Sequence, residues 1–164
     1  MLSFINRYIA SIVLFISILI NSIEINVLGK PASHFVNIQL ILIYAFKISN
    51  PNLNFAKGTS LFVLSIINDV LIGHYFGTSG LLFFIVFGVA AYQASIKLRS
   101  VFVTEWISFS VAIFLAYFLF FGIEYFHGYK IVISQILINL ALTIFVYPLF
   151  WVVISKLLSP NAYR

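Results

Sequence analysis

Long apolar runs separated by short polar connections dominate the chain. A helix needs about 20 residues, at ~1.5 Å each, to cross a ~30 Å hydrocarbon core, and we interpret six runs as membrane-spanning helices on that basis. They cover residues 8–25, 32–48, 58–72, 79–96, 106–126 and 131–154. The pattern predicts an all-α, polytopic membrane protein whose residues 1–164 form a single transmembrane domain of six helices.

Two of these runs are less apolar than the others. Asn37 lies in the second run, and Asn68 and Asp69 lie in the third. Polar groups at membrane depth are costly unless they face protein or water. We therefore expect these two helices to pack against neighbours within the protein.

Composition agrees with a membrane location. The chain is 63% hydrophobic and 8% charged, with a mean hydropathy of +1.13, whereas soluble domains average about 45–50% apolar and ~25% charged residues. It has no cysteine, which excludes disulfides and thiolate metal sites. The net charge of +5 is small and spread along the chain, so it does not indicate a nucleic-acid surface.

Lysine and arginine lie mainly on one side of the predicted helices. If the N-terminus is cytoplasmic, seven lie on the inner side and two on the outer side. The inner seven are Arg7, Lys47, Lys57, Lys97, Arg99, Lys156 and Arg164, and the outer two are Lys30 and Lys130. This positive-inside asymmetry predicts that both termini are cytoplasmic.

Acidic and histidine side chains gather near the outer ends of the helices in this topology. They are Glu24, His34, Asp69, His74, Glu124 and His127, and only Glu105 is left at the inner face. One interpretation is that short loops simply hold polar residues at the membrane surface. The other is an outward-facing cavity that binds a cation, a small polar ligand or a partner's loop. No two histidines have the i, i+4 spacing of a helical metal site, so we predict neither a metal nor any other cofactor.

Asp69 interrupts the apolar stretch SIINDVLIGHYFG of residues 65–77. An aspartate at the centre of a membrane helix costs ~2.5 to 3.5 kcal/mol, so it should face protein or water. Gly73 and Gly77 follow at GxxxG spacing, but they lie between two predicted helices, which favours a tight turn over helix dimerisation. Asp69 then either stabilises its own hairpin or contacts a partner, and both interpretations stay open.

The second and sixth helices carry further polar side chains. His34, Asn37 and Tyr44 share one side of the second helix, which we predict faces the bundle. Together with Glu24, Asp69, Gly73, Gly77 and Glu124, they are our candidates for partner or pocket residues.

In the sixth helix, Gln135, Asn139 and Thr143 repeat at i, i+4 and i+8. Such a stripe is typical of hydrogen bonding between membrane helices. Pro148 lacks a backbone donor and predicts a kink in the same helix.

Motifs of catalysis do not occur in the sequence. It contains no G-x-S-x-G, no H-E-x-x-H and no glycine-rich phosphate loop. We therefore predict a protein that is not an enzyme.

A series of short motifs runs through nearly the whole chain. In order, they are Pro31, Tyr44, Pro51, the stretch N-D-V-L-I-G-H-Y-F-G, Tyr92 before a basic loop, and Tyr147-Pro148. This series resembles the MreD family of bacterial rod shape-determining proteins. Asp69, Gly73 and Gly77 match the aspartate and the glycine-punctuated turn of that family, whereas Ile66 and Asn68 stand where glycine and leucine are more usual.

The resemblance implies a scaffold of the cell-elongation complex in the bacterial inner membrane, which maintains rod shape and organises peptidoglycan synthesis. The implied fold is similar to that of the substrate-binding subunits of energy-coupling-factor vitamin transporters. The implied partners are the lipid bilayer, an MreC-like single-span protein, the actin-like MreB, a membrane glycosyltransferase and a penicillin-binding transpeptidase. The alternative is a transport subunit that binds a small solute in the outer cavity, although we see no paired interrupted helices and no internal repeat.

Overall fold

Helices account for nearly all of the described part of the chain in the computed structural model. The structure describes residues 15–16, 26–27, 30–31, 35–49, 55–72, 75–95, 102–128 and 132–158. The elements are β1 (Asn26–Val27), β2 (Lys30–Pro31), α2 (Ile38–Ser49), α3 (Phe55–Ile72), α4 (Thr78–Ser95), α5 (Phe102–Phe126) and α6 (Ile133–Leu158). β1 and β2 form one short antiparallel pair. The prediction of a helical fold is confirmed.

Three of the described helices are long and apolar enough to cross a membrane: α4, α5 and the Ile133–Val153 part of α6. α2 has 12 residues, which reach only ~18 Å at helical rise. α2 and α3 contain shorter apolar stretches. Length and composition therefore indicate a membrane protein, and the total of six spans stays a prediction.

The ends of α3, α4 and α5 lie close to the predicted positions. α3 and α5 end at the predicted residues, and α4 is displaced by one residue at each end. Gly77 precedes α4 with a φ of 95°, and Gly128 follows α5 with a φ of 74°. Glycine adopts such positive φ angles readily, so it marks these turns in the sequence as well as in the structure.

The helix predicted over 32–48 is shorter in the structure. Residues 35–37 form a turn and coil, and α2 begins at Ile38. Asn37 Oδ1 accepts the backbone N–H of Leu40 at 3.2 Å. An asparagine in this position caps a helix by accepting an N–H group that has no partner within the helix. The prediction of one helix over all of 32–48 is corrected accordingly.

The other differences concern helix starts and the N-terminal run. Apart from residues 15–16, which are helical, the helix predicted over 8–25 lies outside the described residues. α3 begins three residues before its predicted start, and α5 begins four residues before its own. The helix predicted over 131–154 begins two residues later and ends four residues later in the structure, as α6.

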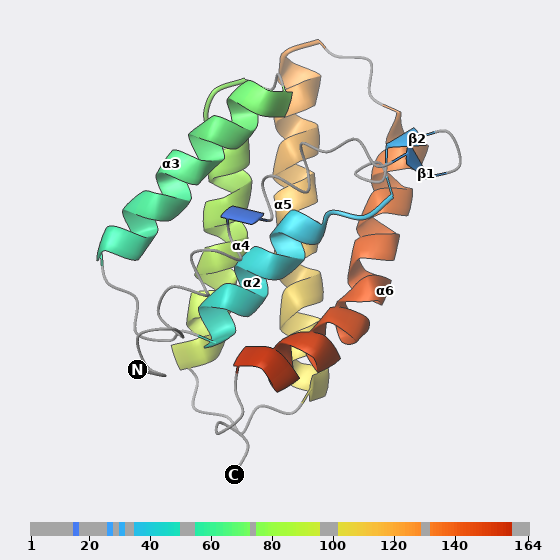
Figure 1. Cartoon of the computed structure of the whole chain (residues 1–164). Coiled ribbons are helices and arrows are strands. Elements are labelled where there is room, and N and C mark those ends of the chain that lie inside the picture. The colour runs from blue at the N-terminus through green and yellow to red at the C-terminus, as the bar shows by residue number, and fades with distance from the viewer. Residues whose placement is uncertain are drawn as a thin grey trace.

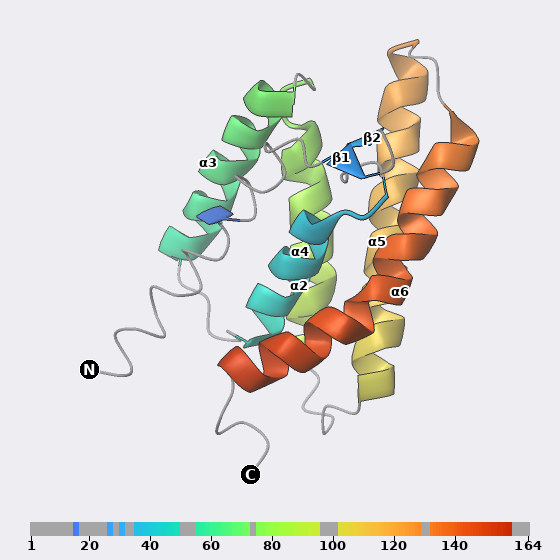
Figure 2. The ribbon, with the colours of Figure 1, turned by 45° about the vertical axis from the view of Figure 1, so that its right-hand side comes forward.

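The described helices form a bundle in which α2 is central. α4 packs against α2, α3 and α5, and α6 packs against α2 and α5. Figure 1 shows α2 in front of α4 and α5, with α3 and α6 on either side, and Figure 2 shows α5 and α6 lying side by side. α2 is buried on almost every side, because eight of its nine residues from 39 to 47 are buried.

Aromatic rings fill the centre of the bundle. Tyr44 packs edge-on against Phe109, with ring centroids 5.1 Å apart, and against Tyr147 at 5.8 Å. Phe109 and Tyr147 stack at 4.1 Å. These three buried rings join α2, α5 and α6.

Large apolar side chains cover the outside of the bundle. Phe114 and Phe118 of α5 and Phe145 and Leu149 of α6 are all at least 60% exposed. Soluble monomers rarely expose apolar patches larger than a few hundred Å². This outer surface is suited to contact with lipid.

The C-terminal part of α6 turns away from the rest of that helix. Both views show it crossing below the end of α2 (Figures 1 and 2). Pro148 lies inside α6, and proline removes one backbone hydrogen bond and bends a helix. The bend agrees with the kink predicted from Pro148.

Candidate functional site

Asp69 of α3 binds the beginning of α4. Its Oδ2 accepts the backbone N–H of Gly77 at 2.7 Å, and its Oδ1 accepts the N–H of Ser79 at 2.9 Å. The N–H of Leu81 donates to the Gly77 carbonyl at 2.9 Å, so the hydrogen-bond pattern of α4 starts at Gly77. Asp69 therefore caps α4 from the neighbouring helix, where its negative charge also interacts favourably with the helix dipole.

Asn68 connects this capping site with α2. Its Nδ2 donates to Ser79 Oγ at 2.8 Å, and its Oδ1 accepts from Gln39 Nε2 at 2.8 Å. Except for Gly77, which is half-buried, all the residues involved are buried. We name the five residues Gln39, Asn68, Asp69, Gly77 and Ser79 the hairpin cluster. The contact through Gln39 was missed in the sequence because nothing local relates that residue to Asn68.

α3 and α4 also approach each other closely beside the hairpin cluster. Ser65 Oγ donates to the carbonyl of Phe62 at 2.7 Å. A Cβ atom placed on Gly80 would lie 3.1 Å from Ser65 Oγ. Glycine at position 80 therefore lets the two helices pack tightly at this level.

A second polar group joins α2, α5 and α6. The backbone N–H of Asn37 donates to Thr143 Oγ1 at 3.0 Å, and Thr143 Oγ1 donates to Asn139 Oδ1 at 3.2 Å. Tyr117 Oη donates to the same Asn139 oxygen. The predicted bonding role of the polar stripe in α6 is confirmed for Asn139 and Thr143, while Gln135 is half-buried.

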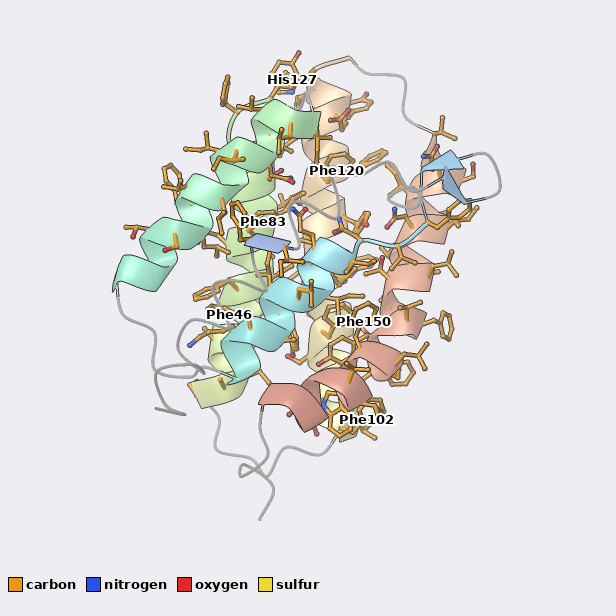
Figure 3. The ribbon with its side chains drawn as sticks, in the orientation of Figure 1. Phe46, Phe83, Phe102, Phe120, His127 and Phe150 are labelled. Atoms are coloured by element: carbon orange, nitrogen blue, oxygen red, sulfur yellow. The ribbon has the colours of Figure 1, made fainter. Side chains whose placement is uncertain are left out.

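A third polar group lies around the N-terminal end of α5, where Phe102 and Phe150 are labelled in Figure 3. Glu105 is only 2% exposed, and its Oε2 accepts from Trp151 Nε1 at 2.6 Å. Tyr44 Oη donates to the Glu105 backbone carbonyl at 3.2 Å. The sequence predicted an inner-face position for Glu105 but not its burial, because its partner Trp151 lies far along the chain.

Trp106 supplies a hydrogen bond that Pro148 removes from α6. Its Nε1 donates to the Ile144 carbonyl at 3.0 Å. Ile144 lies four residues before Pro148, and its carbonyl would otherwise accept a backbone N–H from position 148. The sequence did contain a signal for this contact, since a proline within a membrane helix requires another donor for that carbonyl.

The structure brings together only two of the described candidates for partner or pocket residues. Asp69 and Gly77 are bonded within the hairpin cluster. Asn37 belongs to the second polar group, and Tyr44 lies in the aromatic core about 10 Å farther along α2. Glu124 is half-buried in the last turn of α5. Three candidates lie outside the described residues: Glu24, His34 and Gly73.

The three polar groups bind helices to one another. Among the residues that the structure describes, every buried side-chain nitrogen or oxygen atom has a hydrogen-bond partner. The same part of the chain contains no group of three or more His, Asp or Glu side chains that could hold a metal ion. In the described residues, the polar side chains form hydrogen bonds that hold the helices of the bundle together.

Comparisons with protein-family models, with curated proteins and with solved structures found no match to the chain. The three long apolar helices define the class of protein as a helical membrane bundle. Its family and its function are matters for proposal.

Proposed function

We propose that the protein is a scaffold of the bacterial cell-elongation complex and not an enzyme. In this role it maintains rod shape from the inner membrane by organising the proteins that synthesise peptidoglycan. Two kinds of observation support the proposal. The first is the motif series that resembles the MreD family, and the second is the structural role of its most specific motif, which contains Asp69 and Gly77.

The observation that carries the proposal is the bond between Asp69 and Gly77. Both residues match the family pattern, and in the structure the carboxylate of one caps the helix that starts at the other. The two residues thus fix the geometry between α3 and the start of α4. A protein whose most specific motif sets the shape of a helix pair is suited to presenting that pair to other proteins.

The outer surface of the bundle supports the same role. The polar side chains described above bond inward, and exposed large apolar residues occur on α3, α4, α5 and α6. In the proposal, such faces contact lipid and the membrane helix of an MreC-like single-span protein. MreB, the glycosyltransferase and the transpeptidase then join the same complex.

The proposal includes the finer topology. It has six membrane-spanning helices, with residues 8–25 as the first, and both termini in the cytoplasm. The positive-inside distribution of lysine and arginine supports this arrangement. The arrangement would be similar to the fold of energy-coupling-factor substrate-binding subunits.

Native mass spectrometry of the full-length protein, purified in detergent after co-expression with an MreC-like protein from the same genome, tests the proposal. We expect a stable complex of the two chains, and none with an unrelated single-span protein as the control. If the protein instead retains a small molecule and no partner chain, the scaffold proposal is wrong and the transport alternative is favoured.

A further inference from the structure

Two turns of the bundle are fixed at the same level by a ring contact. The ring of Tyr75, in the turn between α3 and α4, stacks on the ring of His127, just after α5, with centroids 4.1 Å apart. His127 Nδ1 also lies 2.7 Å from the Ile123 carbonyl, within hydrogen-bond distance. Figure 3 shows His127 at this end of the bundle, above the ends of α3 and α5.

Aromatic side chains crowd the surface at this level. Phe76 is 77% exposed, Phe126 is 87% exposed, and Tyr125 is exposed between Phe126 and the body of α5. Tyr125 packs edge-on against Phe126, with centroids 6.2 Å apart. We name Tyr75, Phe76, Tyr125, Phe126 and His127 the ring cluster.

The exposed side chains of α5 change in kind along the helix. Between positions 103 and 119 the largely exposed ones are valine, isoleucine, leucine and phenylalanine, which have no polar atoms. Tyrosine and histidine, which combine an apolar ring with a polar atom, are exposed only after that, at Tyr125 and His127. Membrane proteins place purely apolar side chains against lipid tails and amphipathic rings at the headgroup level.

The length of α5 agrees with this change. Its 25 residues extend ~37 Å at helical rise, which exceeds a ~30 Å hydrocarbon core by more than one turn. One end of α5 must therefore lie beyond the lipid tails unless the helix is strongly tilted. At the end that carries the ring cluster, the exposed side chains include the amphipathic rings of Tyr75, Tyr125 and His127.

We propose that the ring cluster lies in the lipid headgroup region and sets the depth of the bundle in the membrane. The partner of this surface is the boundary between headgroups and acyl chains, continuous with the lipid that covers α5 below it. The stack of Tyr75 on His127 keeps the α3–α4 turn and the end of α5 at one common depth, so both turns contact the same layer of headgroups.

Spin labels on single cysteines test the proposed depth, and the chain has no cysteine of its own. Phe76→Cys and Phe126→Cys place labels in the ring cluster without removing the Tyr75–His127 stack. Phe114→Cys and Phe145→Cys are matched controls on exposed positions of α5 and α6. Each full-length variant is reconstituted in phospholipid vesicles, and its collision rates with oxygen and with a water-soluble nickel complex give the depth of the label.

We expect equal depths for the labels at positions 76 and 126, close to the phosphate groups. The label at position 114 should lie ~18 Å deeper, which is twelve residues at helical rise. Full exposure of positions 76 and 126 to water, or depths within the acyl chains similar to that of position 114, would overturn the proposal. Protection of these two labels from both reagents would also overturn it, because a second copy or a partner protein would then cover the ring cluster.

Discussion

Asp69 is a buried carboxylate whose two oxygens each accept a backbone N–H group of α4. Placing an aspartate in a membrane helix costs ~2.5 to 3.5 kcal/mol. A hydrogen bond to a charged group contributes about 1.5 to 3 kcal/mol, and Asp69 makes two. The cost and the gain are therefore of similar size, and an aspartate is tolerated at this depth because α4 begins beside it.

Replacement of Asp69 by alanine should leave the N–H groups of Gly77 and Ser79 without their acceptor. We expect the free energy of unfolding to fall by about 2 to 4 kcal/mol. Asp69→Asn should lose about half as much, because an amide keeps one acceptor oxygen but turns its NH₂ group toward a backbone donor. Titration of the detergent-solubilised protein with SDS, followed by far-UV circular dichroism, measures the change.

The control for this prediction is Glu124→Ala, which removes a carboxylate from a half-buried position of α5. Its expected cost is about 1 kcal/mol or less. An Asp69→Ala variant no less stable than Glu124→Ala would show that the capping contact does not stabilise the hairpin.

Gly77 is required for its backbone conformation and not for space. Its φ is 95°, and a Cβ atom at this position would have nothing within 4 Å. Gly77→Ala should therefore cost about 1 to 2 kcal/mol through backbone strain alone. Gly88→Ala is the matched control, because Gly88 has equal space but lies within α4, where alanine should stabilise the helix by about 0.5 to 1 kcal/mol. If the same titration gives equal unfolding free energies for the two variants, then alanine at position 77 causes no backbone strain, and the prediction is wrong.

At the scale of elements, α5 fixes the bend of α6 from both sides of Pro148. Trp106 bonds the carbonyl of Ile144 before the proline, and Glu105 bonds the indole of Trp151 after it. Adjacent residues of α5 thus hold two positions of α6 that are seven residues apart. The direction of the C-terminal part of α6 depends on these contacts as well as on the proline.

A double-mutant cycle of Trp106→Phe and Pro148→Ala tests this account of the bend. In the wild-type background, Trp106→Phe should cost about 1 kcal/mol beyond lost packing, because the Ile144 carbonyl loses its donor. In the Pro148→Ala background that extra cost should vanish, since the alanine introduced at position 148 restores a backbone N–H. The coupling, measured from unfolding free energies, should be about 0.5 to 1 kcal/mol. Identical costs in both backgrounds would mean that the indole does not compensate for the proline.

The sequence predicted elements well where the signal is local. The glycine turn located the end of α3 and the start of α4 to within one residue. The start of α2 was predicted wrongly although Asn37 is itself a capping residue, because the apolar residues around it suggested a continuous helix. The burial of Glu105 was not predicted for a different reason: it depends on Trp151, and no local pattern connects two residues so far apart along the chain.

The candidate site was predictable to a similar extent. Asp69 and its glycine turn stood out because a charge in an apolar run needs a partner. The structure then identified the partners as backbone N–H groups of the next helix. Spacing along the sequence does not predict whether the outer acids and histidines converge on a cavity, because convergence of side chains from different helices depends on how those helices pack.

At the scale of the whole molecule, the described bundle has polar contacts inside and an apolar surface outside. Three polar groups and an aromatic core connect the central α2 with the helices around it. Exposed apolar side chains then cover the outer helices. In our proposal this bundle organises the cell-elongation complex through its membrane-facing surface.

The most direct test of this central claim is the shape of the cells that make the protein. If the proposal holds, depletion of the protein in the organism that makes it, followed by microscopy of cell length and width, should turn rod-shaped cells round, and the wild-type gene should restore the rods. Asp69→Ala should restore them poorly even where immunoblots show normal amounts in the membrane. Unchanged rod shape after complete depletion would contradict the account.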